Sequence, residues 1–373
     1  MKIGFFLPNA TFDLPGAPEV GGIETFAFTV GEALLELGHE VVLFGGEPKP
    51  GRRHRETSIP LRLFPYIETK SIPDIGTRFQ RLVQRLHFGW MTRRAWRAER
   101  FDAALVFKPF DWPVAWRWKA RQPELRVIMN FQGTDWFAFD RRFYRYVDAA
   151  FAVSPQTADL AEQHLGSRPP VVPNPADLKN FAPASAGETR ATTGPLRLAA
   201  SGRLIGWKGF ANLIEAVDRV RSDGLDVEAE LAGKGPERDA LEALIRERGL
   251  EDHFRLVGLL DTKELRDLLQ RADAYVAPSI GMDAGPLAVC EAGAAGLPLL
   301  LSDQIGQRPM LSAADYLDYP ARDVDALARG IHELAARRGD PAWTDRQARH
   351  NRFRELFDPE SVARRIVALI ETV

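Results

Sequence analysis

The sequence predicts an α/β protein made of two doubly wound domains, and three observations carry this prediction. The chain has 373 residues, which is enough for two domains of ordinary size. Apolar strand patterns alternate with amphipathic helix patterns through both halves, as in parallel sheets covered by helices on both faces. A segment rich in Ala, Ser, Thr, Gly and Pro separates the two halves and is predicted to be a linker.

The first half opens with a strand, a loop, a helix and a second strand. Residues 2–7 (KIGFFL) are typical of a buried strand, and the next loop is rich in Pro and Gly. A helix is expected over 23–37, where Gly38 ends it, and a strand over 41–44, which makes a right-handed parallel crossover. Residues 46–75 are expected to be irregular. The later predictions are strands at 103–107, 127–130 and 151–153 and a helix at 157–165.

The second half repeats this order of strands and helices. Strands are predicted at 196–200, 227–232, 254–257, 274–277 and 299–302, and helices at 210–220, 237–248, 262–271 and 287–295. Asp358 and Pro359 suit the start of a final amphipathic helix. The expected domains are therefore 1–180, a linker at 181–195, a second domain at 196–355, and a closing helix at 356–373 that packs back on the first domain.

Composition and charge narrow the class of protein. A formal net charge of −2 gives no case for nucleic acid as a partner. A single Cys excludes an internal disulfide framework and a cysteine-based metal site. The first residues, MKIGFFLPNA, lack the features of a signal peptide, and no apolar run approaches the roughly 18 residues of a membrane span. A cytoplasmic protein is expected.

Two acids stand out in the stretch from Pro278 to Pro298. Asp283 lies in the loop that follows an apolar strand, where open α/β sheets bind ligands, and Glu291 lies inside the next predicted helix. A carboxylate can accept hydrogen bonds from two vicinal hydroxyls, so a ribose diol is a suitable partner. The alternative is structural: Asp283 caps the helix and Glu291 is salt-bridged.

A basic, aromatic helix is expected over 77–101. It carries seven arginines and one acid, Glu99, with aromatic and aliphatic residues between them. This is typical of helices that lie on anionic bilayers, with Arg81, Arg85, Trp90, Arg93 and Arg94 as candidate membrane contacts. The alternative is a surface helix with a buried apolar stripe and a solvated basic face.

These motifs, in this order, resemble those of family-4 retaining glycosyltransferases of the GT-B fold, in which two Rossmann-like domains face a central cleft. The resemblance covers nearly the whole chain and is strongest from Leu196 to Asp303. The matching segments are a Gly-Arg-Leu segment, a Lys-Gly pair, a Gly-x-Gly-Pro turn and two acids eight positions apart after Pro-Ser. Within the family, the chain resembles bacterial glycosyltransferases of the lipopolysaccharide and exopolysaccharide type.

The resemblance implies a role for each matching residue. Arg203 and Lys208, beside Gly202, would hold the donor pyrophosphate, Asp283 would contact the donor sugar, and Glu291 would contact the ribose diol. Other expected donor contacts are Gly21 and Gly22 at the first helix, Gly233, the loop of Gly285, Pro286 and Leu287, and main-chain groups near Val257. Gly21 and Gly22 could also form a plain turn.

The sequence departs from the family in two places that matter for chemistry. Asp283 stands where Glu is usual, so its carboxylate reaches one methylene less. Gln132 stands where the first domain often carries a His near the reaction centre, and Gln cannot act as a general base. Asp135 is a candidate substitute on the acceptor side, and its alternative role is to cap a turn.

The expected activity is transfer of a sugar, with retention, from a nucleotide diphosphate sugar to a hydroxyl of a glycan or lipid-linked acceptor. A UDP-sugar is favoured and GDP-mannose comes next; no cofactor and no metal are expected. The implied setting is cell-surface polysaccharide or lipopolysaccharide synthesis at the inner face of the cytoplasmic membrane. The alternatives are a sugar-nucleotide epimerase of the same fold and a non-catalytic sugar-nucleotide-binding protein.

Overall fold

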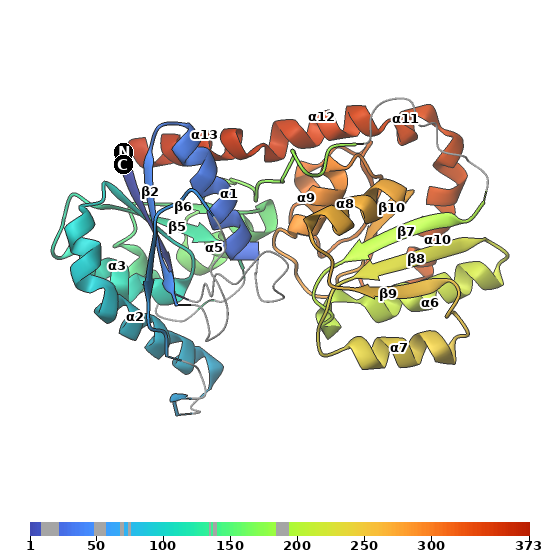
Figure 1. The fold of residues 1–373 in the computed structure, drawn as a ribbon, viewed down its shortest axis with the longest axis horizontal. Helices are drawn as coiled ribbons and strands as arrows, with labels where there is room; N and C mark the ends of the chain where they lie inside the picture. The colour runs from blue at the N-terminus through green and yellow to red at the C-terminus, as the bar shows by residue number, and fades with distance from the viewer. Residues whose placement is uncertain are drawn as a thin grey trace. The chain divides into compact units, whose positions relative to one another are not determined.

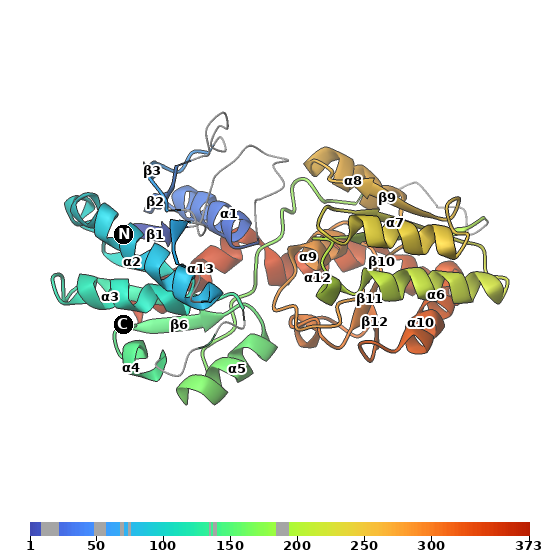
Figure 2. The same ribbon diagram turned by 90° about the horizontal axis from the view of Figure 1, so that it is seen from below.

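A computed structural model describes residues 1–8, 22–47, 57–67, 71–73, 76–133, 136, 140–183 and 194–373. The chain divides into two compact units, shown in Figures 1 and 2. The first unit contains Met1–Pro175 and Pro359–Val373, and the second contains Ala176–Asp358.

The first unit is built on a six-stranded sheet in the order β3-β2-β1-β4-β5-β6, in which every pairing is parallel. Its strands are β1 Lys2–Leu7, β2 Glu40–Gly46, β3 Leu61–Phe64, β4 Ala103–Val106, β5 Arg126–Phe131 and β6 Ala149–Ala152. Its helices are α1 Gly22–Glu36, α2 Thr77–Glu99, α3 Trp112–Lys119, α4 Asp140–Tyr144, α5 Pro155–Leu165 and α13 Pro359–Glu371. The short 3-10 turn Pro109–Asp111 precedes α3.

Helices cover both faces of this sheet. On one face, α1 and α13 bury a core that includes Phe26, Leu34, Val362 and Ile366. On the other face, α2, α3 and α5 bury an aromatic core. The strands alternate between the two cores because successive side chains of a strand point to opposite faces.

The second unit is built on a six-stranded sheet in the order β12-β11-β10-β7-β8-β9, which is also parallel throughout. Read from the β9 edge, this order is the same as that of the first unit. Its strands are β7 Leu196–Ser201, β8 Val227–Ala232, β9 Phe254–Gly258, β10 Ala274–Ala277, β11 Leu299–Ser302 and β12 Tyr316–Tyr319. Its helices are α6 Phe210–Ser222, α7 Arg238–Glu247, α8 Thr262–Arg271, α9 Leu287–Ala294, α10 Val324–Ala336, α11 Pro341–Thr344 and α12 Arg346–Phe357. One face is covered by α6, α7 and α10, and the other by α8, α9 and α12.

The predicted fold class is confirmed: the chain contains two doubly wound sheets covered by helices. Two strands were not predicted. The edge strand β3 lies in the segment expected to be irregular, and β12 follows the last predicted strand.

The observed division differs from the expected boundaries. The second unit begins at Ala176, and Phe181, the first residue of the predicted linker, is buried in the core of that unit. Residues 184–193 of this linker lie outside the described residues. The last helix of the first unit begins at Pro359, as Asp358 and Pro359 predicted, whereas the boundary of the closing segment was expected at residue 356.

None of the helices within the described residues combines the length and apolar character that a bilayer span requires.

Candidate functional site

The candidate site of the second unit lies where its strand order reverses, between β7 and β10. Ligands of open α/β sheets bind at this position, outside the carboxyl ends of the strands. The two strands are joined here by Tyr275, whose hydroxyl donates to the carbonyl of Ser201 at 3.1 Å and accepts from the backbone N–H of Ser201 at 3.1 Å. The loops after both strands therefore start from fixed points.

Glycines allow these loops to touch. Gly209 is the N-cap of α6 with φ 70°, and a Cβ on it would lie 2.0 Å from the carbonyl oxygen of Pro278. Gly233, with φ 147°, would place a Cβ 1.9 Å from the carbonyl oxygen of Gly202. Both positions need glycine for conformation and for space. The N-terminus of α6, the positive end of its dipole, is thus held against the loop after β10.

An ion pair occupies the centre of this arrangement. Lys208 Nζ lies 2.6 Å from Oδ2 of Asp283, and Ser279 Oγ donates to the same oxygen at 3.0 Å. Ser302 Oγ in turn donates to the carbonyl of Ser279 at 2.6 Å. The backbone of Asp283 is also fixed, since its N–H donates to Gln304 O at 2.9 Å. Because an ammonium has three N–H donors, Lys208 retains two for an anionic ligand.

Arg203 follows β7 and is exposed. Its guanidinium has no carboxylate partner within the part of the chain that the structure describes. The backbone beside it is held, because the N–H of Leu204 donates to the carbonyl of Lys234 at 2.9 Å. Arg203 therefore offers a planar donor fork near Lys208 and the start of α6.

Glu291 lies within α9 and is partly buried between Cys290 and Ala292, both of which are fully buried. Burial raises the pKa of the Glu291 carboxyl to about 7, and the negative charge of Asp177 adds to the shift. Among the described residues, no group donates a hydrogen bond to this carboxylate. A raised pKa and an unused acceptor together are typical of a functional carboxylate.

The structural alternative for Asp283 is wrong, and that for Glu291 finds no support among the described residues. The N-cap of α9 is Pro286, so Asp283 does not cap that helix. Glu291 forms no salt bridge within the described ranges. Asp283 pairs with Lys208 instead.

The remaining donor-side residues line neighbouring loops. Val257 is partly buried near the end of β9, and the N–H of Gly233 donates to the carbonyl of Gly258 at 2.7 Å. Gly285 and Pro286 precede α9, and Leu287 is its first residue. The roles expected for these residues stay predictions.

In the first unit, Gln132 follows β5, and its Nε2 donates to Oδ1 of Asn174 at 2.9 Å. Gly22 is the first residue of α1. Gly21 and Asp135 lie outside the described residues. The expected roles of these four positions stay predictions.

One of the candidate membrane contacts is wrong. Arg85 is only 5% exposed and forms a buried ion pair with Asp111, whose Oδ2 also accepts N–H groups of Phe107 and Lys108. A buried side chain cannot reach a bilayer. Arg81, Trp90, Arg93 and Arg94 are exposed.

Tyr275, Ser279 and Asp177 were not predicted to be functional residues. Tyr275 hydrogen-bonds to Ser201 and Ser279 to Asp283, so both support the site. Asp177, which precedes Glu291 by more than a hundred positions in the sequence, raises the pKa of the Glu291 carboxyl. The Pro-Ser pair was visible as a motif, but no local pattern indicates that its serine bonds to Asp283.

Comparison with known proteins identifies the family of the chain. Residues 20–180 match the family model "Glycosyltransferase Family 4", and residues 184–351 match "Glycosyl transferases group 1". A phosphatidyl-myo-inositol mannosyltransferase of Mycolicibacterium smegmatis is 25% identical over 100% of this chain and 94% of its own. A glycogen synthase of Mycobacterium tuberculosis is 36% identical over 47% of this chain and 42% of its own.

Solved structures show the same fold. A sucrose-phosphate synthase of Thermosynechococcus elongatus superposes with a TM-score of 0.80 at 21% identity, covering 99% of this chain and 98% of its own. Anabaena HepE in complex with UDP superposes with a TM-score of 0.74 at 15% identity, covering 100% of both chains.

The chain is a glycosyltransferase of the GT-B fold, and it belongs to the family-4 glycosyltransferases. Glycolipid and polysaccharide synthesis are the activities named among its relatives.

Proposed function

We propose that this chain transfers a sugar, with retention of anomeric configuration, from a nucleotide diphosphate sugar to a hydroxyl of a glycan or lipid-linked acceptor. The observation that carries the proposal is the Lys208–Asp283 pair at the strand-order reversal, beside the N-terminus of α6. In this proposal the cation binds phosphate and the neighbouring carboxylate binds sugar hydroxyls. Glu291, whose carboxylate accepts no hydrogen bond from the described residues, is the proposed partner of the ribose diol.

The proposed reaction breaks the bond between the anomeric carbon and the β-phosphate oxygen. The acceptor hydroxyl forms its bond to the same face of that carbon, and its proton passes to the departing phosphate. Negative charge that develops on the leaving group is stabilised by Arg203, Lys208 and the positive end of α6. No step needs a metal or a general base from Gln132.

A UDP-sugar is the favoured donor, supported by the UDP present in the HepE structure. GDP-mannose comes second, supported by the full-length relatives that are named mannosyltransferases. The proposed acceptor is lipid-linked or part of a surface glycan, and the proposed location is the inner face of the cytoplasmic membrane. The name of the phosphatidyl-myo-inositol enzyme supports a lipid acceptor.

A thermal-unfolding panel of UDP-, GDP-, ADP- and dTDP-sugars and the free nucleotides tests the donor. One nucleotide class is expected to stabilise the protein by roughly 3 kcal/mol at a hundredfold excess over its dissociation constant. The stabilising donor should then release free nucleotide slowly without an acceptor. No stabilisation by any donor would refute the proposed site.

Incubation of the protein with the stabilising donor, without an acceptor, also tests the two alternative functions, a sugar-nucleotide epimerase and a non-catalytic binding protein. An epimerase would convert the donor to its epimer without an acceptor, and a binding protein would leave the donor intact. The membership of the chain in a glycosyltransferase family favours neither alternative.

A further inference from the structure

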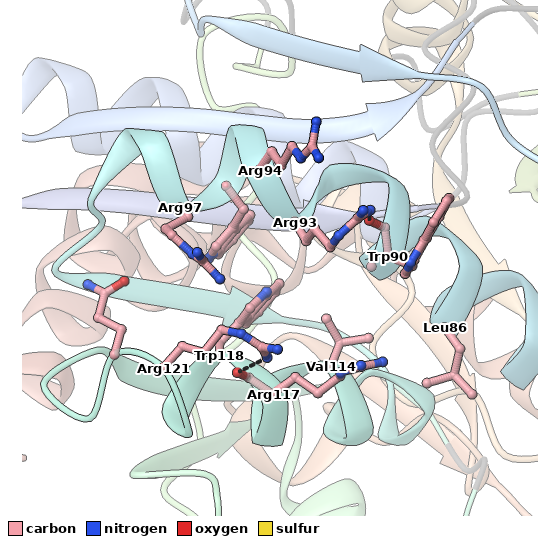
Figure 3. Close-up of a pocket in the computed structure, with 12 residues that line it drawn as sticks. Leu86, Trp90, Arg93, Arg94, Arg97, Val114, Arg117, Trp118 and Arg121 are labelled. Carbon is pink, nitrogen blue, oxygen red and sulfur yellow. Dashed lines mark hydrogen bonds between the residues drawn. The ribbon is translucent and has the colours of Figure 1, made fainter.

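A cavity of about 250 Å³ lies between α2 and α3 of the first unit, away from the sheet edge where Gln132 lies (Figure 3). Five arginines line it: Arg93, Arg94 and Arg97 from α2, and Arg117 and Arg121 from α3 and the turn after it. Figure 3 shows Arg93 and Arg97 on the side of α2 that faces Arg117 and Trp118 of α3.

The five arginines are not neutralised. No acidic residue lines the cavity, and none of the five has a carboxylate partner among the residues that the structure describes. The hydrogen bonds they make go to backbone: Arg93 donates to the carbonyl of Trp90, and Arg121 Nη1 donates to the carbonyl of Arg117 at 3.3 Å. The chain as a whole carries a net charge of −2, so this concentration of positive charge is local. Like charges gathered in one cavity favour an anion as occupant.

The walls of the cavity are packed and buried. Trp96 and Trp118 stack in parallel with ring centroids 4.0 Å apart, and they are only 3% and 8% exposed. Gly89 allows α2 and α3 to approach closely, since a Cβ there would lie 2.7 Å from Cγ2 of Val114. Trp96 Nε1 is buried in this wall and has no hydrogen-bond partner among the described residues. The cavity is thus built by tertiary packing and is more than a gap between exposed side chains.

The surroundings of the cavity are apolar as well as basic. Trp90 is 51% exposed and Leu86 is 36% exposed, and both line the cavity. Phe79 on α2 and Trp116 on α3 are also exposed, at 43% and 44%. Solvent-facing Trp, Phe and Leu beside unpaired Arg are typical of surfaces that enter the interface of a bilayer, where aromatic rings lie at headgroup level. A soluble polyanion would need the arginines but not these apolar side chains.

We propose that this cavity binds the phosphate-bearing headgroup of an anionic phospholipid. The guanidinium groups of Arg97 and Arg117, from the two walls, hold the phosphodiester through paired N–H donors. Trp90 and Leu86 contact the glycerol and the first methylenes of the acyl chains. This goes beyond electrostatic attraction to a membrane, because it assigns a discrete lipid site, and it does not depend on which sugar donor the second unit uses.

The test compares two double variants of the full chain that remove equal charge. R97Q/R117Q changes both walls of the cavity, and R142Q/R365Q changes exposed arginines on α4 and α13 of the same unit. Flotation uses vesicles of phosphatidylcholine with and without phosphatidylglycerol, at about 0.15 M salt. We expect the cavity variant to lose binding to the anionic vesicles by roughly tenfold or more, and the control variant to stay within about twofold of the original protein.

Tryptophan fluorescence distinguishes a lipid site from a site for free phosphate. Dihexanoyl phosphatidylglycerol, used below its micelle concentration, is expected to change the emission of the original protein and not that of R97Q/R117Q. Inorganic phosphate is expected to bind at least tenfold more weakly, because it gains no contact with Trp90 and Leu86; W90A should reduce this difference.

Several results would overturn the proposal. The first is that inorganic phosphate and the short-chain lipid bind equally well. The second is that the protein binds anionic vesicles but its fluorescence does not respond to the short-chain lipid. The third is that the two double variants lose vesicle binding equally. Thermal unfolding of each variant with and without the nucleotide donor shows whether it is folded. If the cavity variant is still stabilised by the donor, its loss of lipid binding reports on the cavity alone and not on the donor site of the proposed transferase.

Discussion

The two units share one strand order and use their charged residues in opposite ways. In the second unit, Lys208 is paired with Asp283 at the carboxyl ends of the strands. In the first unit, five arginines line the cavity between α2 and α3 without carboxylate partners among the described residues. A paired cation is held in one position for a ligand of defined shape, whereas unpaired cations attract any anionic surface. The shared fold therefore says little about function, which is decided by side chains on loops and helix faces.

The largest expected effect tests this contrast within α2 itself. Arg85→Ala should lower the free energy of unfolding by about 3–5 kcal/mol, because it leaves Asp111 charged and buried without its partner. Arg94→Ala, on an exposed part of the same helix, should change it by no more than about 0.5 kcal/mol. Urea unfolding followed by tryptophan fluorescence measures both. Equal losses would mean that Arg85 is not distinguished from its neighbours by burial.

The second prediction concerns the paired cation of the second unit. Lys208→Ala should lower kcat by roughly 10²–10³, the usual effect of losing one electrostatic donor in a transition state. Release of nucleotide from the stabilising donor is the measurement. Lys263→Ala, at an exposed position of α8, is the matched control and should retain full turnover. Near-normal turnover of Lys208→Ala would show that this ammonium does not contact the leaving phosphate.

The third prediction follows from the raised pKa of Glu291, about 7 instead of 4.5. Between these values the folded protein holds a proton that the unfolded chain has released. The free energy of unfolding without nucleotide should therefore fall as pH rises from about 4.5 to about 7, by about 3 kcal/mol in total. The loss is complete above pH 7 and absent below pH 4.5.

Nucleotide binding should depend on pH in the opposite sense. A ribose diol donates to the ionised carboxylate, so the stabilisation by nucleotide should grow between about pH 6 and pH 8. Glu291→Gln removes the titrating group and should flatten both profiles. Thermal unfolding from pH 4.5 to pH 8, with and without nucleotide, measures both profiles. If the profiles of Glu291→Gln keep the slope of the original protein, a group other than Glu291 takes up the proton.

The smallest of these effects concerns the loop contact under the ion pair. Gly209→Ala should cost at least about 2 kcal/mol of stability, since the residue has a positive φ and its Cβ would meet the carbonyl of Pro278. Gly224→Ala, with φ 90° and open space around its Cβ, isolates the conformational part and should cost about 1 kcal/mol. Chemical denaturation compares them. Equal costs would mean that the loop after β10 moves aside easily.

The sequence was sufficient for most of the fold because long apolar strands and amphipathic helices carry their own periodicity. It missed β3 because the four residues of LRLF are partly exposed and lie in a Pro-rich region. It missed β12 because YLDY, equally short, has only one buried residue. Edge strands are packed less completely, so their patterns are weak.

The site was predicted in its residue types but not in its contacts. Resemblance indicated Lys208 and Asp283 separately, yet nothing local reveals that side chains 75 positions apart form an ion pair. The same limit explains the error at Arg85. Arg85 is one of several arginines on α2, and its local sequence does not distinguish it from the others. It differs from them in its ion pair with Asp111, which only the fold brings close.

The placement of α13 has a consequence for how the protein is made on the ribosome. Val362, Ala363, Ile366 and Ile370 belong to the core of the first unit, although they are synthesised after the whole of the second unit. The second unit is continuous in the chain and can complete its core before α13 is made, while the first unit must wait with α1 uncovered until α13 leaves the exit tunnel. A chain stalled at Asp358 should therefore present a protease-resistant second unit and a protease-sensitive first one, so nascent molecules would complete the second unit before the first.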